Sequence, residues 1–263
     1  MSTGSLLGPA PLKWTYIYGL GDSADASAWH RDEWVRGLVG VDGVSRVVVH
    51  EARKAPQPED VARPLNDWAG LVEVHVDDAT VVAEVLAPRV RAELGGRLAA
   101  LRGLLSTVEE EYDLRRDVPA QQHPYATEAI SWKDTPPPAG EPGDTDDLWR
   151  YVYFFRYKDE VPWVEGEDWY LGHHTREGRQ LPGLRRYLTW RRRRCDTLPD
   201  EDAALFNGFA RYTELCFETF EEWHNATHAH GPRWRMADAW PTGVWTDYQQ
   251  LFIGTSPAVD TDG

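Results

Sequence analysis

Apolar and polar residues alternate with a period of two along several short segments of the first half of the chain. In residues 67–76, Val72 and Val74 would lie on one face of a strand, and Glu73 and His75 on the opposite face. Between such segments the apolar spacing changes to that of a helix. The elements predicted are, in order, a strand at 14–18, a helix at 26–38, strands at 45–53 and 67–76, a helix from 77 to about 86, and a strand within 101–113.

The second half repeats this order of elements. The pattern predicts a strand at 151–157, a helix at 167–180, strands at 185–193 and 209–217, a helix at 218–228, and a strand at 245–253. Each half therefore has the β-α-β-β-α-β order of a ferredoxin-like unit. The strand faces that carry Glu73 and Glu214 are polar and need cover, so we expect the two sheets to pack face to face. The predicted fold class is α+β, with two ferredoxin-like repeats that form one intramolecular barrel.

A segment rich in proline, glycine and acidic residues separates the two halves. Its run Pro136-Pro137-Pro138 can neither continue a helix nor donate to a β-ladder. We therefore expect a first repeat at 1–117, a linker at 118–147 and a second repeat at 148–263. A single-repeat protein would have to dimerise to cover its sheet, whereas two repeats make that contact within one chain. The expected state is a monomer or a homodimer.

One segment of the second half resembles a known family. Residues 173–187, HHTREGRQLPGLRRY, are similar to the EthD-type segment of the dimeric α+β barrel superfamily, in which a helix carries a histidine shortly before a Pro-Gly turn and a strand with Arg and Tyr. The resemblance implies the barrel fold proposed above and an active site in the second half. The first half has Glu33 and Trp34 in place of the two histidines, and Asp42 in place of Pro182, so we expect it to be structural.

A second likeness concerns the last predicted helix. Residues 217–230 are similar to the end of the corresponding helix in polyketide cyclases of the same superfamily, which carry a catalytic histidine there beside a tyrosine. The resemblance implies a catalytic role for His228 or His230. The superfamily also contains cofactor-free monooxygenases, dehydratases, isomerases and haem-binding members, so the fold alone does not fix the reaction.

Composition and charge exclude several classes of partner. The net charge of −15 argues against nucleic acid or an anionic membrane as the main partner. The run Arg191–Arg194 is the exception, and it fits either a solvated strand end or a patch that holds an anionic ligand. No apolar run reaches the roughly 18 residues of a membrane span, and no secretory leader is visible. The two cysteines, Cys195 and Cys216, suggest reduced, inert thiols and a cytoplasmic protein.

Histidines are the leading candidates for catalysis, because their ordinary pKa suits proton transfer near neutral pH. His173 and His174 are adjacent on a predicted helix, and we favour His174 because it matches the apolar Trp34 of the first half. A hydrogen-bonded structural histidine is the alternative at this site. His224 and His228 have the i, i+4 spacing that metal sites also use. A metal site or a haem ligand there is a minor alternative, and the expected cofactor content is none.

Aromatic and acidic residues of the second half complete the predicted site. Tyr187 and Tyr212 would orient substrate oxygens, and Glu214 would position a substrate oxygen or a histidine. The alternative for Glu214 is an ion pair with Arg186 across the packed sheets. The predicted site contains the catalytic residues His174, His228, His230, Tyr187, Tyr212 and Glu214, and the substrate-binding residues His173, Trp190, Trp223, His224 and Arg186.

Two classes of function fit these observations. The first is a cofactor-independent acid–base enzyme, such as a lyase, dehydratase, cyclase or isomerase, that acts on a phenolic, polyketide-like or other oxygenated hydrophobic molecule. The 13 Trp and 11 Tyr residues suit a pocket for such a substrate, and the chain has no GxGxxG or P-loop motif. The second is a non-catalytic binding or accessory protein with an aromatic pocket. A cofactor-free monooxygenase is a further alternative.

Overall fold

The first half of the chain forms a four-stranded antiparallel sheet. The structure is a computed structural model that describes residues 11–108, 112–113, 148–178, 181–193, 198–229 and 244–254. The sheet has the order β2-β3-β1-β4 that a ferredoxin-like unit requires. Its strands are β1 (Leu12–Leu20), β2 (Val44–Glu51), β3 (Gly70–Val76) and β4 (Leu98–Thr107).

Two helices cover the outer face of this sheet. The first is continuous through α1 (Ala26–Trp29), η1 (His30–Val35) and α2 (Arg36–Val39), and the second through α3 (Ala79–Val81), η2 (Val82–Leu86) and α4 (Ala87–Glu93). Asp78 caps the second helix by accepting hydrogen bonds from the backbone N–H groups of Thr80 and Val81. The sequence predicted an end near Leu86, but the wide turn of η2 accommodates Pro88, which lacks an N–H, and the helix continues to Glu93.

The second half forms a sheet with the same core topology and one added strand. Its order is β5-β7-β8-β6-β9. The strands are β5 (Tyr112–Asp113), β6 (Trp149–Tyr157), β7 (Arg186–Arg191), β8 (Arg211–Phe217) and β9 (Trp245–Ile253). One outer helix comprises α5 (Trp163–Trp169), η6 (Tyr170–His174) and α6 (Thr175–Gly178), and the other comprises α8 (Phe220–His224) and η8 (Asn225–Ala229).

The two halves exchange elements at their boundary. The short strand β5 comes from the first half of the sequence but pairs with β7 of the second sheet. In return α7 (Ala203–Phe206), which follows η7 (Asp200–Asp202) in the second half of the sequence, packs on the first sheet. There the indole Nε1 of Trp14 donates a hydrogen bond to the carbonyl oxygen of Leu205 at 3.0 Å. Each sheet is therefore completed by residues from the other half of the chain.

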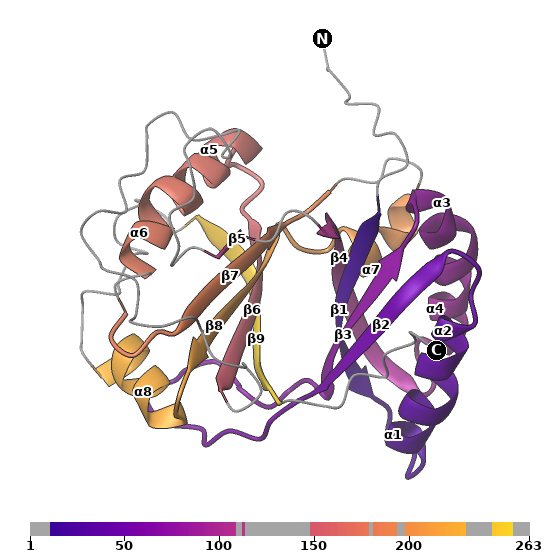
Figure 1. The fold of residues 1–263 in the computed structure, drawn as a ribbon, viewed down its shortest axis with the longest axis horizontal. Helices are drawn as coiled ribbons and strands as arrows, with labels where there is room; N and C mark the ends of the chain where they lie inside the picture. The colour runs from indigo at the N-terminus through magenta and orange to yellow at the C-terminus, as the bar shows by residue number, and fades with distance from the viewer. Residues whose placement is uncertain are drawn as a thin grey trace.

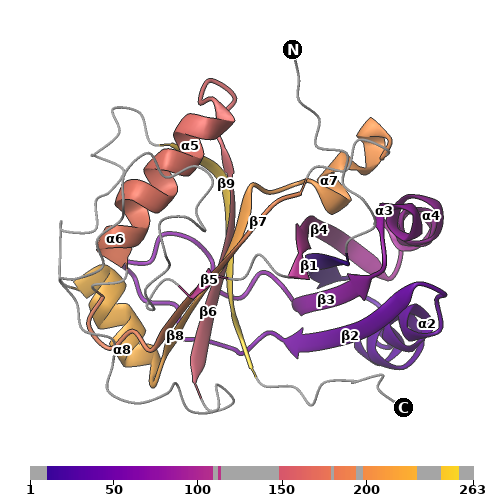
Figure 2. The ribbon, with the colours of Figure 1, turned by 45° about the horizontal axis from the view of Figure 1, so that its top comes forward.

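The two sheets face each other, and the helices lie on their outer sides (Figures 1 and 2). An apolar cluster joins the inner faces and contains Ile17, Leu71 and Leu104 of the first half with Val152, Phe154, Leu188, Trp190, Phe209, Tyr212, Leu251 and Ile253 of the second. The predicted fold class, two ferredoxin-like repeats in one intramolecular barrel, is confirmed. No helix among the described residues is long and apolar enough to cross a bilayer.

The proposed division of the chain at 118–147 concerns a segment outside the described residues. The sheet-to-sheet contact is made within one chain, and the expectation of a monomer or a homodimer stays a prediction.

Candidate functional site

The second sheet has two faces, and the alternation of side chains along its strands decides what reaches each face. Tyr187 and Phe217 point toward the helices, whereas Trp190 and Tyr212 belong to the apolar cluster between the sheets. Glu214 lies on the same inner face, where its carboxylate accepts a hydrogen bond from Tyr212 at 3.0 Å. The sequence predicted one pocket that would contain Tyr187 together with Tyr212, Glu214 and Trp190. The structure corrects this, because Tyr187 lies on the helix side of the sheet and the other three residues lie on the opposite side.

His174 is buried between η6 and the second sheet, against two tyrosines. Its Nε2 lies 3.3 Å from the hydroxyl of Tyr153, which in turn lies 3.4 Å from the hydroxyl of Tyr187. Gly178 permits this arrangement, because a Cβ atom at that position would lie 2.7 Å from the ring of Tyr187. The structure therefore brings the predicted His174 and Tyr187 together through Tyr153, which the sequence did not single out.

Aromatic rings surround the imidazole of His174. The ring of Trp245 packs edge-on with its centroid 4.5 Å away, and the ring of Tyr170 stacks at 5.2 Å. Tyr248 stacks on Tyr153 at 5.3 Å. Trp245 and Tyr248 are only partly buried, so this side of the cluster, along the edge strand β9, reaches the surface.

A bulge in β9 brings both of these rings to the same face. Residues 245 and 248 would point to opposite faces of a regular strand. The pairing of β9 with β6 shifts between Phe154 and Arg156, and Asp247 has a φ of 53° in the left-handed region. Arg102 of the first repeat forms an ion pair with Asp247 at this bulge. The first repeat therefore contacts the element that supplies one wall of the His174 cluster.

Burial controls the protonation of the cluster. It lowers the pKa of His174 to about 3, so the imidazole is neutral near neutral pH. Burial also raises the pKa values of Tyr153 and Tyr187 well above 10. Among the described residues, neither Nδ1 of His174 nor Nε1 of Trp245 has a hydrogen-bond partner. Unpartnered buried polar atoms are costly, and here two of them lie in adjacent rings where a ligand oxygen could pair with them.

A buried ion pair next to this cluster escaped the sequence analysis. Glu167 of α5 accepts hydrogen bonds from Arg211 of β8 at 2.6 and 2.9 Å, and from the hydroxyl of Tyr157 at 2.6 Å. Arg211 also donates to the hydroxyl of Thr189 at 3.1 Å. These contacts hold α5, which belongs to the same continuous helix as His174, against the second sheet. The charged Arg211 within the predicted strand 209–217 was a signal, but the sequence could not identify its partner.

The predicted histidines of the last helix lie apart from these contacts. His228 is half-buried, with its Nδ1 2.7 Å from the hydroxyl of Thr227 and its ring stacked on His224 at 5.7 Å. Nε2 of His224 lies 2.8 Å from a carboxylate oxygen of Asp60. Burial lowers the pKa of His228. Trp223 is fully buried on the helix side, with its ring 4.9 Å from that of Tyr151, and its substrate-binding role stays a prediction.

Some predicted residues and alternatives remain without a structural description. His230 and the side chain of His173 lie outside the described residues. In the part of the chain that the structure describes, no group of three or more His, Cys, Asp or Glu side chains is arranged to hold a metal ion. The roles assigned to His224, His228 and His230 stay predictions.

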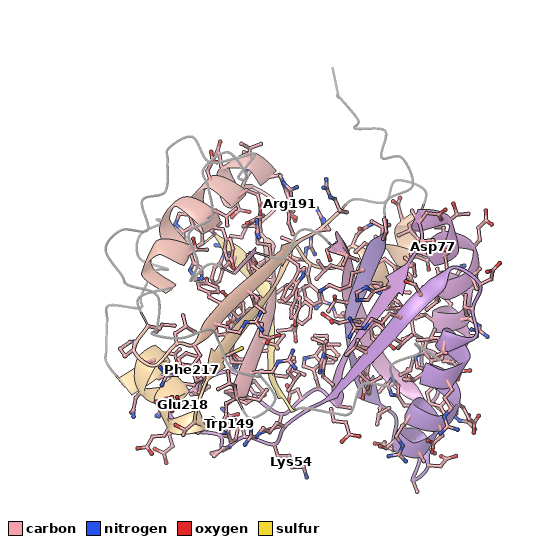
Figure 3. The ribbon with its side chains drawn as sticks, viewed as in Figure 1. Lys54, Asp77, Trp149, Arg191, Phe217 and Glu218 are labelled. Carbon is pink, nitrogen blue, oxygen red and sulfur yellow. The ribbon has the colours of Figure 1, made fainter. Side chains whose placement is uncertain are left out.

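The inner faces of the two sheets carry a set of paired charges, with side chains filling the space between the sheets (Figure 3). Arg150 donates to Glu214 at 2.7 and 2.9 Å and lies 3.3 Å from Nδ1 of His50 in the first repeat. Lys13 forms an ion pair with Glu73 at 3.0 Å, and its ammonium lies 3.8 Å from the ring centroid of Trp190. Each ion pair lies within one repeat, whereas the contacts of Arg150 with His50 and of Lys13 with Trp190 cross from one repeat to the other.

The partner of Glu214 is therefore Arg150, and this corrects the expected pair with Arg186. Burial alone would raise the pKa of Glu214, but the guanidinium of Arg150 outweighs burial and lowers that pKa to about 2. The carboxylate is ionised and satisfied. Its geometry suits a structural role between the sheets better than contact with a substrate.

No protein-family model matches the chain, and no curated protein matches its sequence. Solved structures are similar to it in fold. An anthrone oxidase-like protein is 10% identical over 96% of this chain and 94% of its own, with a TM-score of 0.53. A variant of chlorite dismutase from Candidatus Nitrospira defluvii is 14% identical over 96% of this chain and 93% of its own, with a TM-score of 0.48. The chain therefore has the fold of the dimeric α+β barrel proteins, with both halves of the barrel supplied by one polypeptide.

Proposed function

We propose that the protein is a cofactor-independent acid–base enzyme that acts on a phenolic or polyketide-like aromatic molecule. The proposed site lies between the second sheet and the helix α5–η6–α6. The observation that carries the proposal is the buried, neutral imidazole of His174, whose Nδ1 has no partner among the described residues and which aromatic rings surround. A flat substrate would stack on these rings and present an oxygen to the imidazole.

His174 would act as the general base. With its proton on Nε2, the imidazole donates to the hydroxyl oxygen of Tyr153 and leaves the lone pair of Nδ1 for a substrate proton. A pKa of about 3 makes the free imidazolium unfavourable. Proton transfer becomes favourable when the proton leaves a negative charge on the bound substrate, because the two charges then stabilise each other in a site of low dielectric. Tyr187 would extend the hydrogen-bonded chain through Tyr153.

A cofactor-free monooxygenase is the second candidate, and the similarity in fold to an anthrone oxidase-like protein favours it. Removal of a proton from a phenolic substrate gives an electron-rich anion, which can react with dioxygen without a bound cofactor. The first step is the same in both candidates. They differ in whether oxygen is consumed. A binding or accessory protein would show affinity for the aromatic molecule without turnover.

Hydroxylated anthrones and related phenols are suitable probes. We expect the wild-type protein to convert a member of this panel, and His174→Gln to lower kcat/KM by about 10²- to 10⁴-fold, the usual contribution of a general base. His30→Gln is the matched control, because His30 is also a buried helical histidine with its pKa lowered, to about 4, by burial. Oxygen uptake measured with substrate loss separates the two candidates. Equal activity of His174→Gln and wild type would refute the site, and binding without turnover would establish the accessory role.

A further inference from the structure

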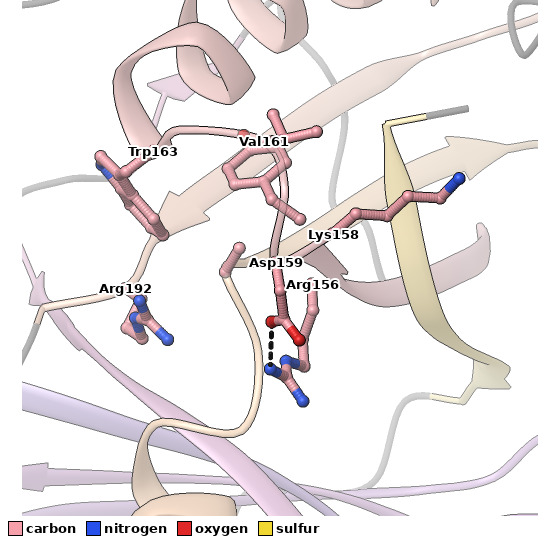
Figure 4. Close-up of a pocket in the computed structure, with 8 residues that line it drawn as sticks. Arg156, Lys158, Asp159, Val161, Trp163 and Arg192 are labelled. Atoms are coloured by element: carbon pink, nitrogen blue, oxygen red, sulfur yellow. Dashed lines mark hydrogen bonds and ion pairs between the residues drawn. The ribbon is translucent and has the colours of Figure 1, made fainter. Parts of the chain in front are cut away.

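A small surface hollow lies between the end of β6 and the beginning of α5. It has a volume of about 180 Å³. Its lining comprises Arg156, Tyr157, Lys158, Asp159, Val161, Trp163, Arg192 and Ala210 (Figure 4). Backbone hydrogen bonds fix its floor: the N–H of Arg192 donates to Ala210, and the N–H of Ala210 donates to Phe155. The hollow is therefore built on three neighbouring strand ends.

The charge of this lining is opposite to that of the chain as a whole. The chain carries 43 acidic and 28 basic residues, Lys and Arg together, whereas the hollow is lined by Arg156, Lys158 and Arg192 and by one acid, Asp159. Figure 4 shows Arg192 facing the Arg156–Asp159 pair across the hollow, with the ammonium of Lys158 directed away. An anion that the acidic chain repels elsewhere would meet two guanidinium groups here.

The packing of Arg192 orients its guanidinium. Its Nη1 donates to the carbonyl oxygen of Asn207 at 3.0 Å, and the guanidinium carbon lies 4.8 Å from the ring centroid of Trp163. The side chain is half-buried, so little rotational freedom remains to be lost on binding. Arg156 differs, because its contact with Asp159 is long, at 3.4 Å, and exposed. Exposed pairs of this kind contribute little, so an incoming carboxylate could replace Asp159.

We propose that this hollow binds the carboxylate of a small aromatic acid. Arg192 and Arg156 would hold the carboxylate, since the planar guanidinium matches its geometry. Trp163, together with the buried side chain of Val161, would contact the ring. The site is separate from the His174 cluster: the wall residue Tyr157 turns its hydroxyl inward to Glu167. An anionic ligand at this hollow would agree with one of the two interpretations of the Arg191–Arg194 run, namely a patch that binds an anion.

The test is isothermal titration calorimetry of the full chain with benzoate, with neutral benzamide and with inorganic phosphate. We expect benzoate to bind at least about tenfold more tightly than either comparison ligand. Arg192→Gln should weaken benzoate binding by about tenfold or more, because a charged hydrogen-bond donor is lost. Arg31→Gln is the matched control, since Arg31 is an exposed arginine paired with its neighbour Asp32 at 3.2 Å, and it should bind benzoate like wild type.

Two further variants keep the result interpretable. Asp159→Asn removes the carboxylate that competes for Arg156 and should tighten benzoate binding. If circular dichroism shows that Arg192→Gln does not fold, the affinity of Asp159→Asn for benzoate becomes the test of the proposal. His174→Phe should bind benzoate as wild type does, which keeps this site distinct from the proposed catalytic one. Benzoate binding that is lost in His174→Phe, unchanged in a folded Arg192→Gln or in Asp159→Asn, or matched by benzamide or phosphate would overturn the proposal.

Discussion

The two repeats place a tyrosine at the same point of their sheets but pair it with different side chains. The strand registers make Tyr16 of β1 equivalent to Tyr153 of β6. Tyr16 accepts a hydrogen bond from the indole Nε1 of Trp34 at 3.0 Å, whereas Tyr153 lies 3.3 Å from the imidazole of His174. An indole N–H can only donate, but an imidazole can donate, accept and carry a proton. The same contact is fixed in the first repeat and chemically versatile in the second.

The inner faces of the repeats are alike. Lys13 pairs with Glu73 in the first repeat, and Arg150 pairs with Glu214 at the equivalent positions of the second. In both pairs burial would raise the pKa of the carboxyl group, but the basic neighbour outweighs burial and lowers it. The likeness suits a shared role in sheet packing. Chemistry is expected where the repeats differ, which is on the helix side of the second sheet.

The largest effect is expected from His174→Phe, which keeps a ring and removes both nitrogens. Activity on the substrate should fall by about 10²- to 10⁴-fold, while stability should change little, because loss of the hydrogen bond to Tyr153 is offset by removal of the unpartnered buried Nδ1. In the first repeat, Trp34→Phe removes the donor to Tyr16. It should cost about 1–2 kcal/mol of stability and leave activity unchanged. Steady-state kinetics and urea unfolding of both variants test the comparison, and an activity loss in Trp34→Phe alone would reverse it.

A large loss of stability is expected from Glu167→Gln. The second repeat has the buried Glu167–Arg211 pair, whereas the first repeat has Gly70 at the position of Arg211. Removing one partner of a buried ion pair leaves the other charge uncompensated and typically costs about 3–5 kcal/mol. The free energy of unfolding in urea is the measurement. The exposed pair of Arg91 and Glu201 provides the control, and Glu201→Gln should change stability by less than about 1 kcal/mol.

A moderate effect on substrate affinity is expected from Arg102→Ala. Its ion pair with Asp247 holds the β9 bulge that turns Trp245 toward His174. Without the pair the bulge should become mobile, and KM should rise about threefold to tenfold, or about 1 kcal/mol, with kcat little changed. Arg97→Ala removes an exposed arginine near Glu33 and should have no such effect. An unchanged KM in Arg102→Ala would show that the Arg102–Asp247 pair does not affect substrate binding through the β9 bulge.

The last expected effect is on the pH dependence of stability. Burial lowers the pKa of His30 to about 4 and of His174 to about 3, from an ordinary value of 6.5. Between those values the unfolded chain binds more protons than the folded one, so stability falls as the pH drops below about 6.5. His30→Phe and His174→Phe should each reduce this slope. Urea unfolding at intervals from pH 7.5 to 4.5 measures it, and slopes identical to wild type would contradict the burial of a neutral imidazole.

Period-two alternation was sufficient to predict most strands, because the helix-side face of each sheet is apolar whereas the inner face also carries charged side chains such as Glu73 and Glu214. It also predicted the bounds of β9, but there the bulge at Asp247 places Trp245 and Tyr248 on one face. A period of two cannot reveal such a shift, although an Asp within an aromatic strand is a weak signal for it.

The partners of buried charges were also beyond sequence reasoning. Arg150 and Arg186 both lie opposite Cys216, one on each neighbouring strand, and are therefore equally placed to reach Glu214. Only the packed side chains show that Arg150 makes the pair. The prediction that Tyr187 and Tyr212 share a pocket was wrong for a simpler reason. Tyr187 of β7 pairs with Leu215 of β8, and Leu215 points to the opposite face from Tyr212. His174 was singled out because the resemblance and the repeat pointed to the same helix, and its catalytic role stays a prediction.

The exchange of β5 and α7 between the halves has a consequence for how the polypeptide can be divided. A cut within residues 118–147 would leave β5 on the first fragment, although it pairs with β7, and α7 on the second, although Leu205 accepts the hydrogen bond of Trp14. Neither fragment would be a self-sufficient module. Co-expressed, they would behave as a split protein whose reassembly restores both sheets, so the two repeats cannot be shuffled as separate building blocks.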